Sequence, residues 1–157
     1  LSKKIYLLAD SDNVDRRKAK GKRRIELEKL SAESENFEYQ STEVKGMENL
    51  LPKVTAKNYM KELVKKEAYD KLKNIDFKQS EYEKEGIGKF YEKQFDKHGI
   101  IKKNQKAFLA DSGTLKNDYK IKLCDFFINS DIKYEGLIED NPILEGIIKK
   151  LYDFIVK

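Results

Sequence analysis

The feature that most constrains this chain is a short apolar run that ends abruptly in acidic residues. Residues 5–9 read Ile-Tyr-Leu-Leu-Ala, and Asp-Ser-Asp-Asn follows at once. A continuous apolar run of this length predicts a strand buried on both faces, as in the middle of a parallel sheet. Strand residues alternate between faces, so Asp10 and Asp12 should point the same way at the carboxyl edge, where open α/β sheets bind ligands. Two parallel carboxylates favour a hard divalent cation, so the motif predicts a Mg²⁺ or Mn²⁺ site.

Turn chemistry is the alternative interpretation of the same tetrapeptide. Asp, Ser and Asn side chains accept hydrogen bonds from nearby backbone N–H groups in turns and at helix starts. On residues 10–13 alone, both interpretations stay open.

A dense group of basic residues follows the acidic pair. Its members are Arg16, Arg17, Lys18, Lys20, Lys22, Arg23 and Arg24. An acidic metal site beside a basic patch suits phosphodiester chemistry, because the cations hold the phosphate while the metal polarises it. We therefore predict that this cluster contacts nucleic acid, with a solvated helix face as the alternative.

The composition narrows the class of protein. The 157 residues, 39% of them charged, fit one domain or one domain with a helical extension. The sequence has no bilayer-spanning run and no signal-peptide pattern, so we expect a cytoplasmic protein without a membrane segment. A lone cysteine, Cys124, excludes an internal disulfide, and its apolar neighbours predict a buried thiol. One cysteine and one histidine, His98, cannot build a zinc site.

Periodicity predicts a strand, a helix and a second strand in residues 1–54. Residues 25–30 continue the basic cluster as a helix, and residues 37–42 alternate aromatic and polar side chains as a strand does. This order is one right-handed crossover unit of an α/β sheet. A parallel connection brings Glu43 or Glu48 towards Asp10 and Asp12, which would complete an acidic cluster. A first-turn helix carboxylate is the alternative for Glu48.

These residues carry a resemblance to a known family. The strand ending in Asp-x-Asp, the basic helix, and the strand leading into Gly46-Met47-Glu48-Asn49-Leu50-Leu51-Pro52 resemble the toprim domain of overcoming-lysogenization-defect (OLD) nucleases. These are ATPase-coupled proteins of phage defence. The resemblance implies a toprim-like small parallel sheet and a metal-dependent DNA endonuclease. It matches Asp10 and Asp12 to the Asp-x-Asp metal motif and Glu48 to the acidic position of the Glu-Asn element.

The same resemblance implies more chain than this sequence contains. Toprim domains carry a catalytic Glu at the end of an earlier strand, whereas this sequence starts at the Asp-x-Asp strand. We therefore expect a carboxyl-terminal fragment of a longer protein, with an ATPase domain upstream as its partner. Without the earlier Glu, the isolated piece would be incomplete for catalysis.

Residues 55–157 should form a mainly helical remainder that packs on the first portion as part of one structural domain. Thr55 is expected to cap a helix containing Tyr59 and Met60, and the aromatic side chains that recur up to Phe95 are expected to be core. Gly99 is expected to end a helix. Residues 132–138 are expected to be a strand or a loop.

The last part of the chain holds a lysine and an amphipathic helix of interest. The resemblance places a lysine that opens a helix near the metal site, and Lys120 matches best, with Lys122 as the alternate. The helix 119–128 is expected to be buried on one side. Pro142 is suited to a first helical turn, and the apolar spacing predicts a helix from there to the end. This final helix should pack on the domain, with a homo-oligomer or ATPase contact as the alternative.

Two other functions compete with the nuclease. The run Asp10-Ser11-Asp12-Asn13-Val14 also resembles motif one of haloacid-dehalogenase-like phosphatases, where the first Asp is a nucleophile and the second a general acid. That family needs a later acidic group, for which Asp111 or Glu139-Asp140 are the candidates. A non-catalytic module that binds nucleic acid or protein is the second alternative.

Overall fold

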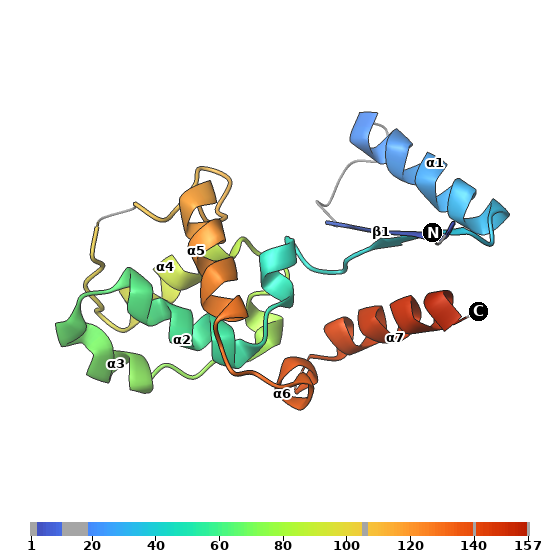
Figure 1. The fold of residues 1–157 in the computed structure, drawn as a ribbon. Helices are drawn as coiled ribbons and strands as arrows, with labels where there is room; N and C mark the ends of the chain where they lie inside the picture. The colour runs from blue at the N-terminus through green and yellow to red at the C-terminus, as the bar shows by residue number, and fades with distance from the viewer. Residues whose placement is uncertain (1–2, 11–18, 105–106, 140, 157) are drawn as a thin grey trace.

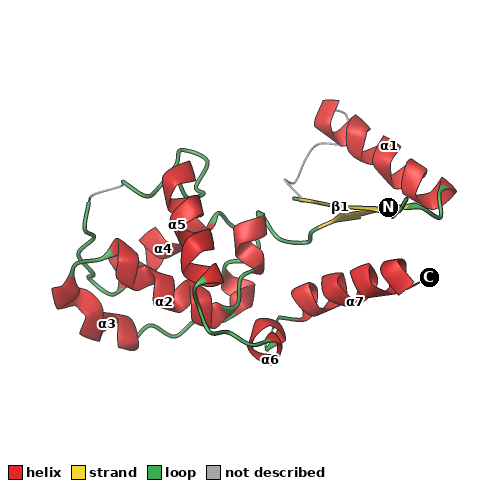
Figure 2. Ribbon diagram, in the orientation of Figure 1, coloured by secondary structure: helices red, strands yellow, loops and turns green. Residues whose placement is uncertain are grey.

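The computed structural model describes residues 3–10, 19–104, 107–139 and 141–156, and for residues 19 and 20 the backbone only. Two strands, β1 (Ile5–Ala9) and β2 (Phe37–Ser41), flank the helix α1 (Ala19–Glu33). The chain then continues through helices α2 (Lys53–Leu63), α3 (Tyr69–Lys73), α4 (Ile87–Lys97), α5 (Asn117–Ile128), α6 (Tyr134–Ile138) and α7 (Pro142–Val156). Three 3-10 turns, η1 (Met47–Leu50), η2 (Lys66–Ala68) and η3 (Gln79–Glu81), separate some of them. The fold is α/β and mostly helical (Figure 2).

The strand-helix-strand prediction is confirmed. β1 and β2 pair in parallel, with Ile5 opposite Phe37 and Ala9 opposite Ser41. The Thr42 N–H extends this ladder by donating to the Ala9 carbonyl over 2.8 Å. The carboxyl ends of both strands therefore lie at one edge of the sheet, where Asp10 directly follows β1.

The prediction that β1 is buried on both faces is wrong. Ile5 is 60% exposed and Leu7 is 37% exposed. The sheet of the described residues has two strands, so β1 lies at an edge, and α1 makes its close contacts with β2. Alternation therefore leaves the Ile5 and Leu7 face of β1 largely uncovered.

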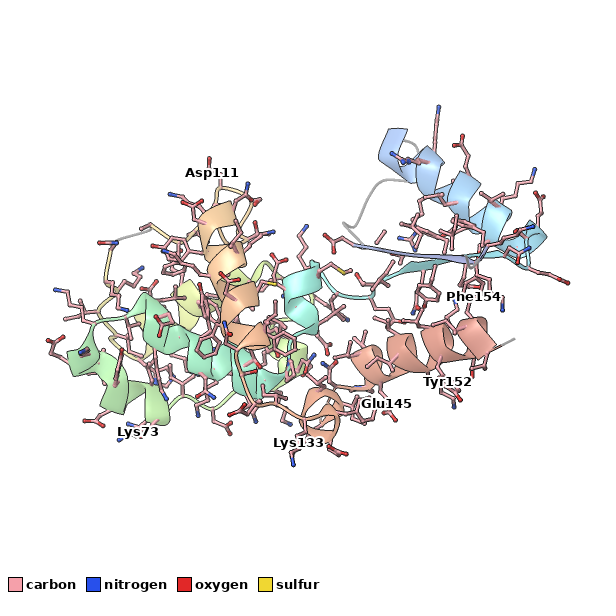
Figure 3. The ribbon with its side chains drawn as sticks, viewed as in Figure 1. Lys73, Asp111, Lys133, Glu145, Tyr152 and Phe154 are labelled. Carbon is pink, nitrogen blue, oxygen red and sulfur yellow. The ribbon has the colours of Figure 1, made fainter. Side chains whose placement is uncertain are left out.

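The opposite face of β1 is covered by the last helix, as the amphipathic pattern predicts. The rings of Tyr6 and Phe154 lie 5.8 Å apart, and the Lys4 ammonium donates to the Phe154 carbonyl over 3.1 Å. Lys150 pairs with Glu38 of β2 at 2.6 Å. In Figure 1, α1 and α7 lie on opposite sides of the strands, and in Figure 3 Phe154 points to the strands. A small core joins these parts, formed by Val44, Leu50, Ile147, Leu8 and Ile143.

The main core lies in the helical body formed by α2 to α5, and it confirms the prediction that the aromatic side chains are core. Its largest fully buried side chains include Tyr59, Phe77, Tyr82, Phe90, Tyr91, Phe95 and Phe108. Their rings contact one another in a chain, for instance Phe77 on Phe90 at 5.0 Å. Buried hydroxyls find backbone acceptors: Tyr91 donates to the Ala56 carbonyl over 3.0 Å. Burial raises the pKa of the Tyr82 and Tyr91 phenols above its usual range.

Both helix-end predictions near glycine and proline are confirmed. Gly99 follows α4 with a φ of +58°, and the Ile100 N–H donates back to the Phe95 carbonyl over 2.8 Å. This is the left-handed helix ending that glycine favours. Pro142 opens α7, and the buried Asn141 side chain accepts a hydrogen bond from the Leu144 N–H at 3.2 Å.

Three local predictions are wrong. Thr55 lies inside α2, which begins at Lys53 after Pro52, because the fixed φ of proline suits the residue before the helix. Residues 134–138 form the helix α6 instead of a strand or loop. Cys124 is exposed on α5. The predicted one-sided burial of residues 119–128 is confirmed, because Leu123 is buried in the main core and Tyr119 and Phe126, on the same side of α5, pack against that core.

Within the described ranges, no helix has both the length and the apolar composition needed to cross a lipid bilayer.

Candidate active site

The segment that follows β2 is fastened to the helical body by backbone and amide hydrogen bonds. The Lys45 N–H donates to the Glu83 carbonyl over 2.6 Å. The side chain of Asn49, which is fully buried, donates to the carbonyls of Tyr82 and Glu85. From the other side, the Asn141 amide donates to the Leu50 carbonyl over 2.7 Å. These contacts hold η1 at the junction between the helical body and the strand unit, which consists of β1, α1 and β2.

Glu48 lies on this fastened turn and pairs with Lys120. The Lys120 Nζ is 2.9 Å from the Glu48 Oε1, and the two side chains are 39% and 11% exposed. The resemblance implies both residues as site residues, although they lie far apart along the chain. The fold brings them together at the edge of the helical body nearest the strands.

Two side-chain oxygens on this turn lack a hydrogen-bond donor among the described residues. The Glu48 Oε1 and the Asn49 Oδ1 are buried, and neither accepts a hydrogen bond from any described residue. Lys120 therefore forms an ion pair with the Glu48 Oε1, but the geometry of this contact is not that of a hydrogen bond. The Glu48 carboxylate folds back over Gly46, where a Cβ would lie 3.0 Å from Oε2 and 3.4 Å from the Asn49 Oδ1. A larger residue at position 46 would therefore crowd the Glu48 carboxylate and the Asn49 amide oxygen.

Helix α5 holds Lys120 and Lys122 on different sides. The Tyr59 hydroxyl donates to the Tyr119 carbonyl over 2.9 Å and ties the first turn of α5 to α2. Two residues along a helix correspond to a rotation of about 200°, so these lysines point in nearly opposite directions. Lys120 reaches Glu48, whereas the Lys122 ammonium lies 5.0 Å from the centre of the Tyr119 ring. This geometry favours Lys120 over Lys122 as the lysine of the candidate site.

The acidic strand end is described only in part. Asp10 is exposed directly after β1, at the sheet edge where Thr42 bonds to Ala9. Asp12 lies outside the described residues, so the distance between the two carboxylates is not part of the structure. Glu43, the alternative to Glu48, is exposed after β2.

The basic cluster is also described in part. Arg16, Arg17 and Lys18 lie outside the described residues, as does the Lys20 side chain. Lys22 and Arg23 are exposed on α1, whereas Arg24 pairs with Glu28 one turn later at 2.8 Å. Lys22 and Arg23 are therefore the described members of the cluster that are accessible to an anionic ligand.

The donor chemistry fits a hard divalent cation. Asp10 offers an exposed carboxylate, and the turn at Glu48 and Asn49 offers oxygen acceptors that lack hydrogen-bond donors. Among the described residues, no three His, Cys, Asp or Glu side chains converge as a metal-binding group. A complete ligand set would thus need Asp12, as the Asp-x-Asp motif predicts.

The acidic candidates for a phosphatase are described in part. Asp111 is exposed in the turn before α5, at the tip of the helical body (Figure 3). Asp140 lies outside the described residues, and its neighbour Glu139 follows α6. The phosphatase alternative therefore stays a prediction.

Two buried amides near the site were not predicted as anchors. Asn49 and Asn141 fasten the Glu48 turn through bonds to carbonyls of other elements. The local sequence around a buried asparagine resembles that around an exposed one. The only sequence signal for their burial was that Asn49 precedes the apolar Leu50 and that Asn141 precedes Pro142.

Comparison with known proteins found no family model, curated protein or solved structure that matches the chain.

Proposed function

We propose that this chain is the toprim-type nuclease portion of a longer, ATPase-coupled defence protein, and that it contributes to metal-dependent cleavage of DNA phosphodiester bonds. The observation that supports this most is the pairing of Glu48 with Lys120 at 2.9 Å. The resemblance implies both as site residues, and they meet beside a parallel strand unit in which Asp10 directly follows β1. Carboxylates and a lysine at the carboxyl edge of a parallel sheet suit phosphodiester chemistry.

In this proposal, Asp10, Asp12 and Glu48 would hold Mg²⁺ or Mn²⁺. A bound cation of this kind activates water and stabilises charge on the leaving oxygen. Lys120 is 39% exposed, so its ammonium can reach a phosphate oxygen without leaving α5. Lys22 and Arg23, exposed on α1, would hold neighbouring phosphates of the DNA backbone.

The experiment that tests the metal site is a Mn²⁺ titration of the 157-residue chain, followed by paramagnetic broadening of backbone amide signals. We expect saturable broadening at residues 10–13 and 43–49. The double variant Asp10→Asn/Asp12→Asn should lose it. Asp153→Asn, an exposed carboxylate on α7, is the matched control and should bind Mn²⁺ like the wild type.

Diffuse broadening, or broadening that the double variant retains, would contradict the metal site. The chemistry is tested in the longer protein by nicking of supercoiled plasmid. Lys120→Gln should lower the nicking rate on the order of 10²-fold, because it removes a positive charge from the site of developing negative charge. Lys122→Gln is the control for charge and position, and an equal loss in both variants would count against the assignment of Lys120.

A further inference from the structure

The ion pair of Glu48 with Lys120 joins two groups that have different ligands under the proposed function. There, Glu48 would hold the divalent cation and Lys120 would hold a phosphate. In the structure the two hold each other, with 2.9 Å between the Lys120 Nζ and the Glu48 Oε1. Among the described residues, no other ammonium or guanidinium group lies within ion-pair distance of the Glu48 carboxylate. The pair therefore has to open before Lys120 reaches a ligand of its own.

The carboxylate side of this pair is held in place by the helical body. Glu48 lies on η1, and the neighbouring Asn49 amide donates to the carbonyls of Tyr82 and Glu85, the latter over 2.9 Å. Asn49 is fully buried, and the Glu48 side chain is 11% exposed. Since backbone carbonyls of another segment hold this turn, the position of the carboxylate does not depend on Lys120.

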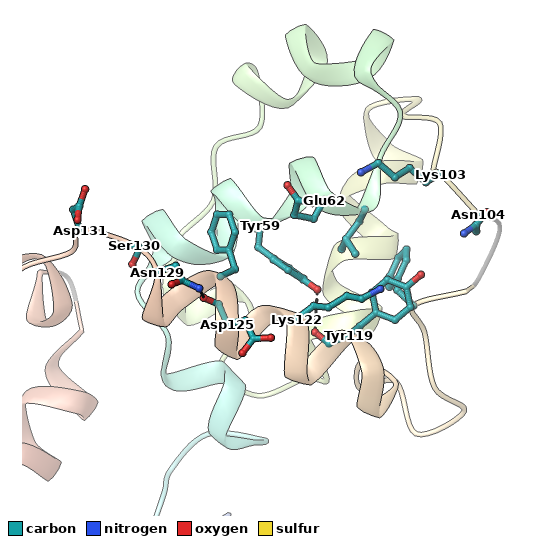
Figure 4. A pocket seen from close by; sticks show the side chains of 13 residues that line it. Tyr59, Glu62, Lys103, Asn104, Tyr119, Lys122, Asp125, Asn129, Ser130 and Asp131 are labelled. Atoms are coloured by element: carbon teal, nitrogen blue, oxygen red, sulfur yellow. Dashed lines mark hydrogen bonds between the residues drawn. The ribbon is translucent and has the colours of Figure 1, made fainter.

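The lysine side of the pair is fixed in its backbone only. The Tyr59 hydroxyl donates to the Tyr119 carbonyl over 2.9 Å (Figure 4), and the Lys120 N–H donates to the Lys116 carbonyl over 3.0 Å. The Lys120 side chain is 39% exposed, and lysine carries its ammonium on a flexible four-carbon stem. The ammonium can therefore leave Glu48 while α5 stays where it is.

The contact between the two side chains is weak enough to be exchanged. The Glu48 Oε1 accepts no hydrogen bond from any described residue, so charge attraction alone holds the ammonium there. Ion pairs that include a solvent-exposed partner contribute little free energy. A divalent cation on the same carboxylate repels the ammonium, because like charges repel strongly at short distance. Cation binding at Glu48 therefore favours the open pair.

We propose that Lys120 exchanges ligands, so that it neutralises Glu48 when no divalent cation is bound and pairs with a DNA phosphate when one is. This inference rests on the proposed function and adds that metal and DNA bind cooperatively. The coupling is reciprocal: a cation that releases Lys120 strengthens DNA binding, and DNA that takes up Lys120 strengthens cation binding by the same factor.

The first test compares Mn²⁺ affinity among variants of the 157-residue chain, measured by paramagnetic broadening of the amides at residues 43–49. Lys120→Gln should bind Mn²⁺ more tightly, on the order of 5-fold, because the cation no longer competes with an ammonium for Glu48. Lys120→Arg keeps the charge and should bind Mn²⁺ like the wild type. Lys122→Gln is the control for net charge, because its ammonium lies over the Tyr119 ring, and it should also match the wild type.

The second test measures the affinity of the same variants for a short DNA duplex, with and without Mg²⁺. Lys120→Gln should weaken DNA binding on the order of 5-fold with Mg²⁺ present, because a phosphate contact is lost. Without Mg²⁺ it should have little effect, since Lys120 then pairs with Glu48. Lys122→Gln should show no difference between the two conditions.

The outcomes separate this inference from the proposal on which it rests. Absence of saturable Mn²⁺ binding in the wild type would overturn the metal site, and the exchange with it. Normal Mn²⁺ binding in the wild type, with equal or weaker binding in Lys120→Gln, would overturn the exchange alone. An equal loss of DNA affinity with and without Mg²⁺ would also overturn it, because Lys120 would then contact DNA independently of the cation.

Discussion

The helical body and the strand unit of this chain are stabilised in different ways. The helical body buries a continuous series of aromatic rings contributed by residues from Tyr59 to Phe108. The strand unit has a small core of three buried side chains, and one of them, Ile147, comes from the last helix. The body is thus held by contacts within residues 56–126, whereas the strand unit depends on contacts between the two ends of the chain.

This difference has a consequence for local stability. Contacts such as Lys4 with the Phe154 carbonyl and Tyr6 with the Phe154 ring join the first strand to the last helix. Regions with few buried apolar contacts open at lower free energy than a dense core. We therefore expect β1 and α7 to open together, and to do so more readily than the helical body.

The largest effect is expected from the aromatic core. Phe90→Ala removes a ring that contacts Phe77 at 5.0 Å and Tyr82 at 5.3 Å. The free energy of unfolding should fall by about 3–5 kcal/mol, as measured by denaturant titration. Ile5→Ala on the exposed face of β1 is the comparison, with a loss of about 0.5 kcal/mol or less. Similar losses in both variants would show that the two regions do not differ as described.

A smaller effect is expected at the contact between the ends of the chain. Phe154→Ala removes the half-buried ring that packs on Tyr6, and the free energy of opening should fall by about 1–2 kcal/mol. Hydrogen exchange should accelerate at β1, β2 and α7 amides and stay unchanged in α4. Tyr152→Ala, on the exposed side of α7, is the control. Faster exchange throughout the protein would mean that the two regions unfold as one unit.

The smallest effect is expected from pH. Burial raises the pKa of the Tyr91 phenol, so the unfolded chain releases this proton first when the pH rises above about 10. The stabilisation from the protonated phenol is complete below the unfolded pKa and falls above it. Between pH 10 and 11 the loss should be about 1 kcal/mol, and Tyr91→Phe should lack this part of the slope. Unfolding curves at several pH values measure it, and identical slopes in both proteins would disprove it.

The candidate active site lies where the two regions meet. The Glu48 turn is bonded to the helical body through Asn49 and to the start of α7 through Asn141. Lys120 arrives from α5 of the helical body. Asp10, by contrast, directly follows β1 of the strand unit. A change in how the strand unit packs would therefore move Asp10 relative to Glu48 and Lys120.

Sequence reasoning succeeded where a pattern is local and failed where burial depends on distant neighbours. The parallel strands, the glycine at the end of α4 and the start of α7 follow from residues within a few positions of each other. Ile5 and Cys124 were wrongly predicted to be buried. Apolar neighbours in the sequence do not specify whether another part of the chain packs over a side chain. Strand or loop was also predicted for α6, a helix of a single turn with a weak periodic signal.

The sequence by itself determined the order of the elements, the aromatic core and the residue types at the site, because alternation, helical spacing and capping act over short distances. The tertiary structure alone decided that Glu48 pairs with Lys120 and that the last helix covers the first strand. It also decided that α5 presents Lys120 to the Glu48 carboxylate and Lys122 to the Tyr119 ring. These contacts depend on how each helix is rotated about its own axis when it packs against residues distant in the sequence. No local sequence pattern specifies that rotation.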